Sequence, residues 1–212
     1  MPERHGPARG GRVTPTAKGA ATRNRIVEGA AAEIRDRGAA GTTLDDIRAR
    51  TSTSKGQIFH YFPGGKEELL LAVAAHEAGQ VLDDQQPYLS DLGTWQAWQD
   101  WRDAVVRRYE RQGVHCPLGV LMTELGRATP AAQALTGQLI ERWQAALRAG
   151  VVRMQESGRA DSRLDADRTA AAMVAGIQGG VAILMSTGAI THLEAALDTS
   201  LMLLRTGPGE SF

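Results

Sequence analysis

Cysteine, aromatic residues, net charge and long apolar runs are all scarce in this sequence of 212 residues. It holds one cysteine and 5% aromatic residues, and 24 Lys and Arg balance 24 Asp and Glu. The single Cys116 excludes an internal disulfide framework and predicts a reducing, cytoplasmic location. The longest mostly apolar stretch, Met173 to Met185, falls short of the roughly 20 residues that a membrane helix needs, and the N-terminus lacks the apolar core of a signal peptide. We therefore expect a soluble protein with no membrane partner.

Catalytic and metal-binding patterns are missing too. The sequence has no Gly-x-Ser-x-Gly elbow, no His-Glu-x-x-His, no cysteine pair for zinc and no phosphate-cradling Gly-Lys-Ser/Thr loop. The five histidines show no metal-ligand spacing. The sequence therefore predicts no enzyme, no metal site and no cofactor.

Charge is distributed unevenly along the chain. Residues 1–66 hold 12 Lys and Arg against 6 Asp and Glu, a net +6, whereas residues 67–212 hold 12 against 18, a net −6. All three lysines lie in the first block and all four tryptophans in the second. A basic block joined to a larger acidic one suggests a nucleic-acid-binding module attached to a part with another task, the alternative being a chance difference in composition.

The pattern of apolar residues and helix caps predicts a helix-turn-helix. Residues 1–16 are rich in Gly, Pro and Arg and read as a disordered basic arm. Ile26, Ala30 and Ile34 follow at helical spacing, and the helix is expected to end near Gly38. Capping boxes at residues 43–46 and 54–57 then begin two short helices, separated by the hydroxyl run 51–54 and ended by residues 63–65. Helix, short helix, turn and short helix is the order in which the last helix enters a major groove.

The rest of the sequence reads as helix, without the alternating pattern that strands need. Helices are expected from residue 66 to about 81, over 95–111, from 116–117 to about 127, from 130 to about 158, over 165–188, and from a capping box at Thr191 and Glu194 to about 207. We predict an all-α fold with a three-helix DNA-binding domain at 17–66, a ligand-binding and dimerisation domain at 67–207, and a tail at 208–212.

Several blocks between Thr22 and Leu69 resemble the DNA-binding domain of the TetR family of bacterial repressors. They are Arg25-Ile26-Val27, Thr42 to Ile47, Ser54-Lys55-Gly56, Phe59 to Phe62 and Lys66 to Leu69. The segment His115 to Gly119, followed by Glu124-Leu125, is similar to the LmrA/YxaF-like branch of that family. The resemblance implies a homodimer that pairs through its last two helices, holds a palindromic operator in double-stranded DNA and releases it when a small effector binds.

The sequence departs from the family at the turn and in the second short helix. Thr51 to Ser54 stand where the family often has Ala-Gly-Val-Ser, so Ser52 carries a backbone penalty if its φ is positive. Phe59 replaces a common Tyr whose hydroxyl contacts phosphate, which makes Tyr61 the better candidate for that contact.

Candidate DNA-binding residues fall into two groups. Thr43, Tyr61 and Lys66 are candidates for phosphate contacts, with a capping role as the alternative for Thr43. Lys55, Gln57 and His60 are candidates for base contacts, although Gln57 also fits a capping box that turns its amide inward. Gly56 would let the backbone approach DNA, unless it is only a tolerated helix-start glycine. The basic arm could enter a minor groove or simply be solvated.

The acidic block carries the candidate effector site. Trp95, Trp98 and Trp101 share one helix face and suit either a core or an apolar pocket, and the resemblance favours the pocket. Cys116 reads as a small residue at a helix start, with redox sensing as the alternative. The full candidate set is Trp95, Trp98, Trp101, His115, Cys116, Met122, Trp143, Met173, Ile177 and Gln178.

The last two helices combine leucine stripes with the small residues Ala175, Gly176, Gly179 and Gly180, which suit either a dimer interface or packing within one subunit. The sequence thus predicts a ligand-responsive repressor whose effector is apolar or aromatic. The alternative is a helical small-molecule-binding protein that no longer reads DNA.

Overall fold

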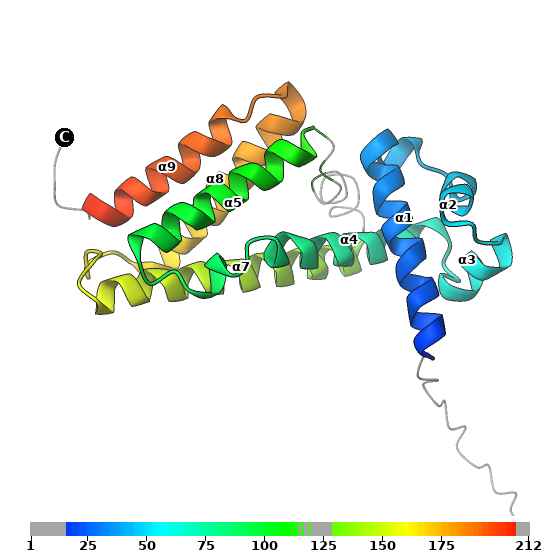
Figure 1. Ribbon diagram of the computed structural model, residues 1–212, viewed down its shortest axis with the longest axis horizontal. Helices are drawn as coiled ribbons and strands as arrows, with labels where there is room; N and C mark the ends of the chain where they lie inside the picture. Colours follow the sequence, from blue (N-terminus) through cyan, green and yellow to red (C-terminus); the bar gives the residue numbers. More distant parts are fainter. Residues whose placement is uncertain (1–15, 115, 117–118, 120–128, 207–212) are drawn as a thin grey trace, which may run out of the picture.

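The computed structural model describes residues 16–114, 116, 119 and 129–206, and over these residues it contains helices and no strand. The predicted all-α fold is confirmed (Figure 1). The elements are α1 (Ala17–Gly41), α2 (Leu44–Thr51), α3 (Lys55–Tyr61), α4 (Lys66–Asp83), the 3₁₀ helix η1 (Tyr88–Ser90), α5 (Trp95–Gln112), α7 (Pro130–Glu156), α8 (Ala166–Thr187) and α9 (Thr191–Thr206). The predicted arm before residue 16, the helix over 117–127 and the tail lie outside the described residues, apart from Gly119.

Local capping fixes the three N-terminal helices where the sequence predicts them. Gly38 has φ 74° and kinks the end of α1. Thr43 caps α2 and Ser54 caps α3, each in a reciprocal capping box with the residue three positions on. Ser52 ends α2 in the left-handed region with φ 49°, and no other described residue besides glycine has positive φ. The positive φ on which a backbone penalty at Ser52 depends is therefore present.

Two hydrophobic cores share α4. The N-terminal core joins α1 and α2 to the first half of α4, with Ile26, Ile47, Phe62, Leu69 and Val73 fully buried. The larger core begins at Ala78 and runs through α5, α7, α8 and α9. Figure 1 shows the result: the three N-terminal helices lie at one end of an elongated helical bundle, and α4 connects the two. Helix α4 therefore packs in both cores.

Helices α8 and α9 approach each other closely. A Cβ on Gly180 would lie 2.5 Å from the Cα of Leu193, and one on Gly176 would lie 3.3 Å from the Cβ of Ala196. Gly179 meets nothing within 4 Å, and Ala175 is exposed. Gly176 and Gly180 therefore serve packing within the chain, whereas Ala175 and Gly179 lie on the exposed face of α8. Helix α9 already includes Thr191, so Thr191 lies one position inside the helix and not at its N-cap as predicted.

Helix α8 is also long and apolar enough to cross a membrane, by length and composition alone. The apolar stretch from Met173 to Met185 is only part of this helix, which has 22 residues, so that stretch alone did not predict a helix of sufficient length. The core helix of a soluble protein meets the same criterion, and one face of α8 packs into the larger core.

Candidate nucleic-acid interface and effector domain

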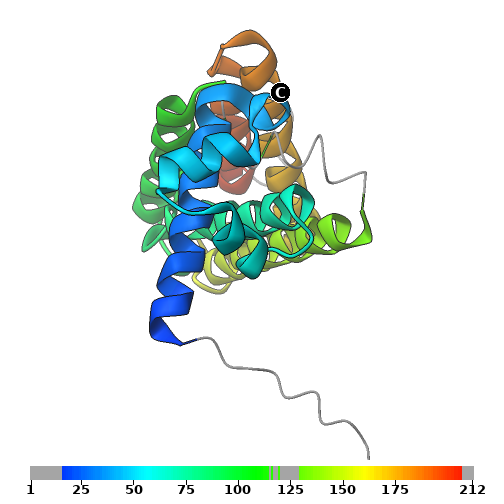
Figure 2. The same ribbon diagram turned by 90° about the vertical axis from the view of Figure 1, so that its right-hand side faces the viewer.

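Helix α3 presents most of its surface to solvent at the free end of the N-terminal domain. Of its seven residues only Ile58 is buried and Tyr61 is half-buried; the others are exposed. Figure 2 looks onto this end of the molecule, with α3 in cyan at the front. A seven-residue helix anchored by one core residue and its caps is free to insert its outer face into a groove.

The Ser54 capping box holds the first turn of α3 and uses part of Gln57. The Gln57 side-chain oxygen accepts a hydrogen bond from the backbone N–H of Ser54 at 2.8 Å. The backbone N–H of Gln57 in turn donates to the Ser54 hydroxyl at 3.1 Å. The capping reading of Gln57 is thus confirmed. Its side-chain nitrogen and the second lone pair of its oxygen remain for a base contact, so Gln57 can read DNA while it keeps the cap.

Gly56 has open space where a side chain would be. A Cβ there would lie 3.9 Å from the Ser54 hydroxyl oxygen and meet no other atom within 4 Å. The folded chain therefore gives no steric reason for glycine inside this helix, where Ala is favoured by about 1 kcal/mol. A reason outside the chain, such as the close approach of DNA, fits this position.

Thr43 and Tyr61 lie at helix ends of the same domain. The Thr43 hydroxyl accepts from the Asp46 amide at 3.2 Å and donates to the Asp46 carboxylate at 2.5 Å, so the capping role is confirmed. The pKa of Asp46 is lowered, chiefly by these hydrogen bonds from the Thr43 hydroxyl and amide. The Tyr61 ring stacks edge-on against His60 at 4.9 Å, and its hydroxyl lies beside Gly19 near the start of α1.

Lys66 does not extend freely toward solvent as a phosphate contact requires. It is half-buried, and its ammonium group donates to the carbonyl oxygen of Ala39 at 3.0 Å, at the end of α1. Lys66 therefore joins α4 to α1. A phosphate contact would have to share or replace this bond.

Ion pairing separates the cations of the N-terminal domain into two sets. Four arginines, two in the C-terminal half of α1 and two on α2, form ion pairs with carboxylates. The pairs are Arg35 with Glu77, Arg37 with Glu33 and Asp46, Arg48 with Asp45, and Arg50 with Glu33 and Asp36. Over residues 16–66, the other cations make no ion pair with any described residue: Lys18, Arg23, Arg25, Lys55 and Lys66. This second set lies at the start of α1, on α3 and at the start of α4. Apart from Lys66, which is held at the Ala39 carbonyl, its members are exposed, so their charge is available to an anionic partner.

The tryptophans of the second domain form core, not the wall of an open pocket. Trp98, Trp101 and Trp143 are 0% exposed, and Trp98 packs edge-on against Trp101 at 5.5 Å. The side-chain oxygen of buried Gln85 accepts from the indole of Trp101 at 2.7 Å and from that of Trp143 at 3.0 Å. Trp95 is half-buried under the Arg205 guanidinium, 4.9 Å from its ring centre. Of the three rings on this helix face, Trp98 and Trp101 thus lie in the core, whereas Trp95 lies at its edge.

The other candidate effector residues divide between described and undescribed positions. His115 and Met122 lie outside the described residues. Cys116 is 2% exposed, and its sulfur accepts from the Gly119 amide at 3.4 Å. Cys116 also adds to the effect of burial, which raises the pKa of Tyr109 above its usual range. Gln178 on α8 has a buried amide nitrogen without a hydrogen-bond partner, so it is available to an acceptor on a ligand.

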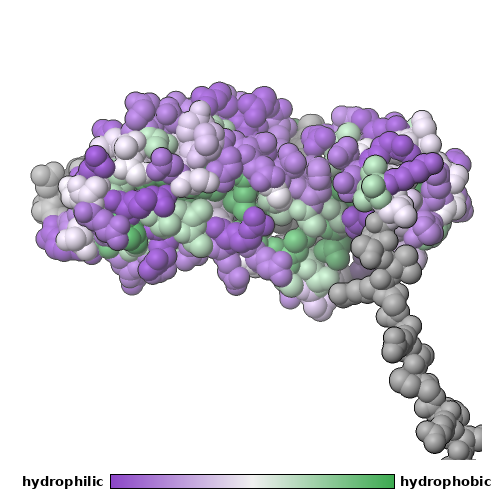
Figure 3. Space-filling view, turned by 60° about the horizontal axis from the view of Figure 1, so that its bottom comes forward, coloured by the Kyte–Doolittle hydropathy of each residue, from purple (hydrophilic) through white to green (hydrophobic). Residues whose placement is uncertain are grey.

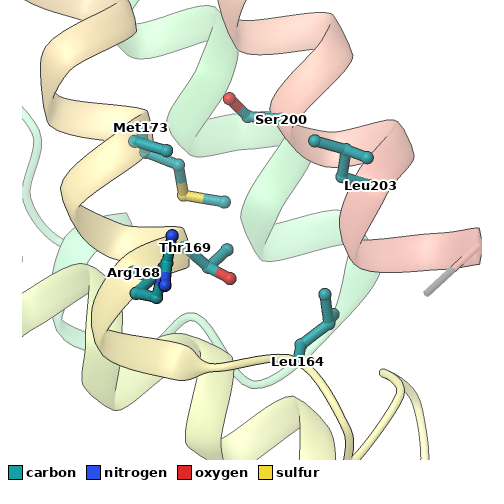
Figure 4. A pocket seen from close by; sticks show the side chains of 7 residues that line it. Leu164, Arg168, Thr169, Met173, Ser200 and Leu203 are labelled. Carbon is teal, nitrogen blue, oxygen red and sulfur yellow. The ribbon is translucent and has the colours of Figure 1, made fainter. Parts of the chain in front are cut away.

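Two apolar hollows lie on the surface. One, of about 370 Å³, opens between the start of α8 and the end of α9, with Arg168, Thr169 and Ser200 among the apolar Leu164, Met173 and Leu203 (Figure 4). The other lies between the first turns of α4 and α7, near Leu71 and Ala132. Figure 3 shows hydrophobic residues gathered where the bundle meets the N-terminal domain. Among the predicted effector residues that the structure describes, Met173 alone lines one of these two hollows.

A polar junction links α1, α4 and α5. Arg35 on α1 pairs with Glu77 on α4 at 3.1 Å, and Glu77 is buried. Arg108 on α5, 2% exposed, donates to the Gln80 carbonyl at 3.2 Å and pairs with Asp84 at the end of α4. Neither Gln85 nor Arg108 was predicted from the sequence. Arg108 continues the core-facing spacing of Trp101 and Val105, which is a signal for it, whereas Gln85 lies in the turn after α4, where no helical spacing applies.

Comparison with known proteins assigns both domains. The sequence profile "Bacterial regulatory proteins, tetR family" matches residues 26–73, and "Tetracyclin repressor-like, C-terminal domain" matches residues 94–200. Two HTH-type transcriptional regulators of Mycobacterium tuberculosis are 28% identical over 113 residues. That alignment covers 49% of this chain and 53% of theirs, about half the length of these curated relatives. The C-terminal match does not name the LmrA/YxaF-like branch, so that finer expectation is not confirmed.

Solved structures share the fold. A TetR transcriptional regulator from Chloroflexus aurantiacus is 27% identical with a TM-score of 0.75, covering 90% of this chain and 98% of its own. A TetR regulator from Haloarcula marismortui, 16% identical, has a TM-score of 0.76 over 87% of this chain and 97% of its own, which shows the fold alone. Regulators of this family are soluble DNA-binding proteins and not enzymes. The matches to both domains, with the helix-turn-helix geometry above, show that the chain belongs to the TetR family of bacterial transcriptional regulators.

Proposed function

We propose that this regulator is a cytoplasmic repressor that binds a palindromic operator as a homodimer and is released by a small apolar or aromatic effector. The observation that carries the proposal is the surface of α3, where Lys55, Gly56 and His60 are all exposed. Lys55 pairs with no described carboxylate, and among the described residues only Ser54 has an atom within 4 Å of a Cβ placed on Gly56. Lys55 and His60 are the proposed base-reading residues, with Gln57 donating from its amide nitrogen.

A single seven-residue helix gives limited specificity, so two copies are needed. Two-fold symmetry would place two α3 helices in successive major grooves, about 34 Å apart, on a palindrome. The outer face of α8 and α9 suits the dimer contact, because it carries small or apolar residues without charge: Ala175, Gly179, Ala182, Ile183 and Leu203. The exposed fractions of Ile183 and Leu203 are 36% and 50% in the single chain.

Release requires an effector that binds more tightly to a conformation in which the two α3 helices are misplaced for DNA. Helix α4 is the proposed lever. The Lys66–Ala39 bond and the Arg35–Glu77 pair tie it to α1, while Arg108 ties its C-terminal end to α5. The effector would enter the core of the second domain, where the buried side-chain nitrogen of Gln178 on α8 would donate to an acceptor on it.

The test combines DNA selection with matched variants. The full-length protein should select a palindromic sequence from a random DNA pool, and Lys55→Ala should weaken its binding and lower its salt dependence. Gly56→Ala should have effects of opposite sign: about 0.5–1 kcal/mol more stability in urea, because alanine favours helix, and at least tenfold weaker operator binding. Stabilisation of Gly56→Ala with unchanged operator binding would show that DNA does not approach this backbone.

The competing proposal is a helical small-molecule-binding protein that no longer reads DNA. The departure at Ser52 favours it, because a strained turn holds α3 less firmly. This reading predicts that no sequence is enriched from the pool, while candidate effectors still quench the fluorescence of the tryptophans, all of which lie outside the helix-turn-helix.

A further inference from the structure

Phe59 is a large apolar side chain on the proposed DNA-reading helix. It is 41% exposed, and every other large apolar residue with comparable exposure in the described chain lies at position 114 or beyond. Its exposed neighbours on α3 are polar residues or glycine. Fully burying a phenylalanine contributes about 1.5–3 kcal/mol, so Phe59 forgoes part of this stabilisation in the free chain.

The ring of Phe59 has a defined place. On the α3 helix Phe59 lies one turn after Lys55 and therefore on the same flank. Its Cε1 atom would lie 3.7 Å from a Cβ on Gly65, so one edge of the ring rests over the start of α4. The packed edge limits the positions of the ring, while the opposite part remains open to solvent.

A phenylalanine ring offers no hydrogen bond to a base edge or a phosphate. In the major groove the one apolar group on the bases is the C5-methyl of thymine, and phenylalanine is among the side chains that contact it. We propose that Phe59 determines operator specificity by packing on a pyrimidine C5-methyl group, that of one thymine in each half-site. This inference rests on the proposed function, since it needs α3 to lie in a major groove.

The experiment removes the methyl group from the DNA and the ring from the protein. Each thymine of the selected operator is replaced by deoxyuridine, singly and in symmetric pairs, and dissociation constants are measured at one fixed salt concentration. One buried methyl group is worth about a fourfold change in affinity. We expect about fourfold weaker binding for one substituted half-site and about fifteenfold for both.

Phe59→Ala should lose affinity for the thymine operator and become insensitive to deoxyuridine at that position. Lys55→Ala is the matched control, because it weakens binding yet should keep the full deoxyuridine effect. Replacing the uracil by 5-methylcytosine, with guanine opposite, tests whether the methyl group or the thymine edge is read: affinity restored in part supports the methyl contact. Thermal unfolding of Phe59→Ala checks the fold, which an exposed residue should leave intact.

The outcomes are separable. If the wild type selects no sequence, the proposed function fails and this assignment with it. If the wild type selects an operator, but no deoxyuridine position weakens it, or Phe59→Ala keeps the same sensitivity, the proposed function stands and the assignment to Phe59 is wrong.

Discussion

The ammonium group of Lys66 donates a hydrogen bond to the carbonyl oxygen of Ala39 at 3.0 Å, across 27 positions of the chain. It satisfies a carbonyl at the end of α1, a place where cations are favoured by the helix dipole. This hydrogen bond joins the first residue of α4 to the C-terminal end of α1. A residue predicted to bind phosphate thus has a structural role before any DNA is present.

Lys66→Met should lower the free energy of unfolding by about 1 kcal/mol, the worth of one hydrogen bond. If Lys66 also reaches a phosphate, the slope of log affinity against log salt should become shallower by about 1 for each protomer. Lys66→Arg keeps the charge and serves as the control. An unchanged slope with lowered stability would restrict Lys66 to the structural role.

Ser52→Gly should stabilise the protein by up to about 1 kcal/mol. Ser52 ends α2 with φ 49°, a conformation that costs residues with a Cβ about 1–2 kcal/mol and glycine little, although glycine loses more backbone entropy on folding. The measurement is urea unfolding followed by far-ultraviolet circular dichroism. Ser52→Ala is the control, expected to give no gain. A glycine variant no more stable than wild type would mean that the turn carries no strain.

What the sequence could predict follows from the range of each interaction. The caps at Thr43 and Ser54 are made by residues three positions apart, so the pattern alone locates them. The bond between Lys66 and Ala39 depends on how two helices pack, which no local pattern reports. The spacing of Trp98 and Trp101 shows that they share one helix face. Whether that face forms core or lines a pocket depends on packing from α7 and on the buried acceptor oxygen of Gln85, which the spacing does not report.

Acidification should remove the stabilisation contributed by the α2 cap. Hydrogen bonds from Thr43 and the nearby Arg37 hold the pKa of Asp46 below its usual value of about 3.9. A carboxylate whose folded pKa is depressed contributes its stability above the unfolded pKa and loses it as pH falls through the folded pKa. Wild-type stability should therefore decline more steeply below about pH 4 than that of Asp46→Asn. Parallel declines of the two in urea unfolding at successive pH values would contradict this.

Gln85→Leu should destabilise the second domain strongly. Its side-chain oxygen accepts from Trp101 and Trp143, and all three side chains are buried. Each buried N–H left without a partner costs about 1–3 kcal/mol, so the loss of both should cost about 2–6 kcal/mol. Tryptophan fluorescence in urea measures it directly. Gln96→Leu, which removes only a surface bond to Asp100, should cost less than about 0.5 kcal/mol. Equal losses in the two variants would show that the Gln85 bonds add little.

Ala182 and Ala145 offer a matched test of the dimer face, since both are exposed alanines within long helices, α8 and α7. If the outer face of α8 and α9 forms the two-fold interface, Ala182→Glu places two carboxylates, one from each protomer, in an apolar contact. The cost is several kcal/mol per buried ion, which raises the dimer dissociation constant at least about a hundredfold. Ala145→Glu should leave the dimer intact. Sedimentation equilibrium at several concentrations measures both, and operator binding should weaken only with Ala182→Glu. In a two-fold interface each substitution occurs once in each protomer, so Ala182→Glu would bury two carboxylates. A dimer dissociation constant equal to that of the wild type would therefore place the interface elsewhere.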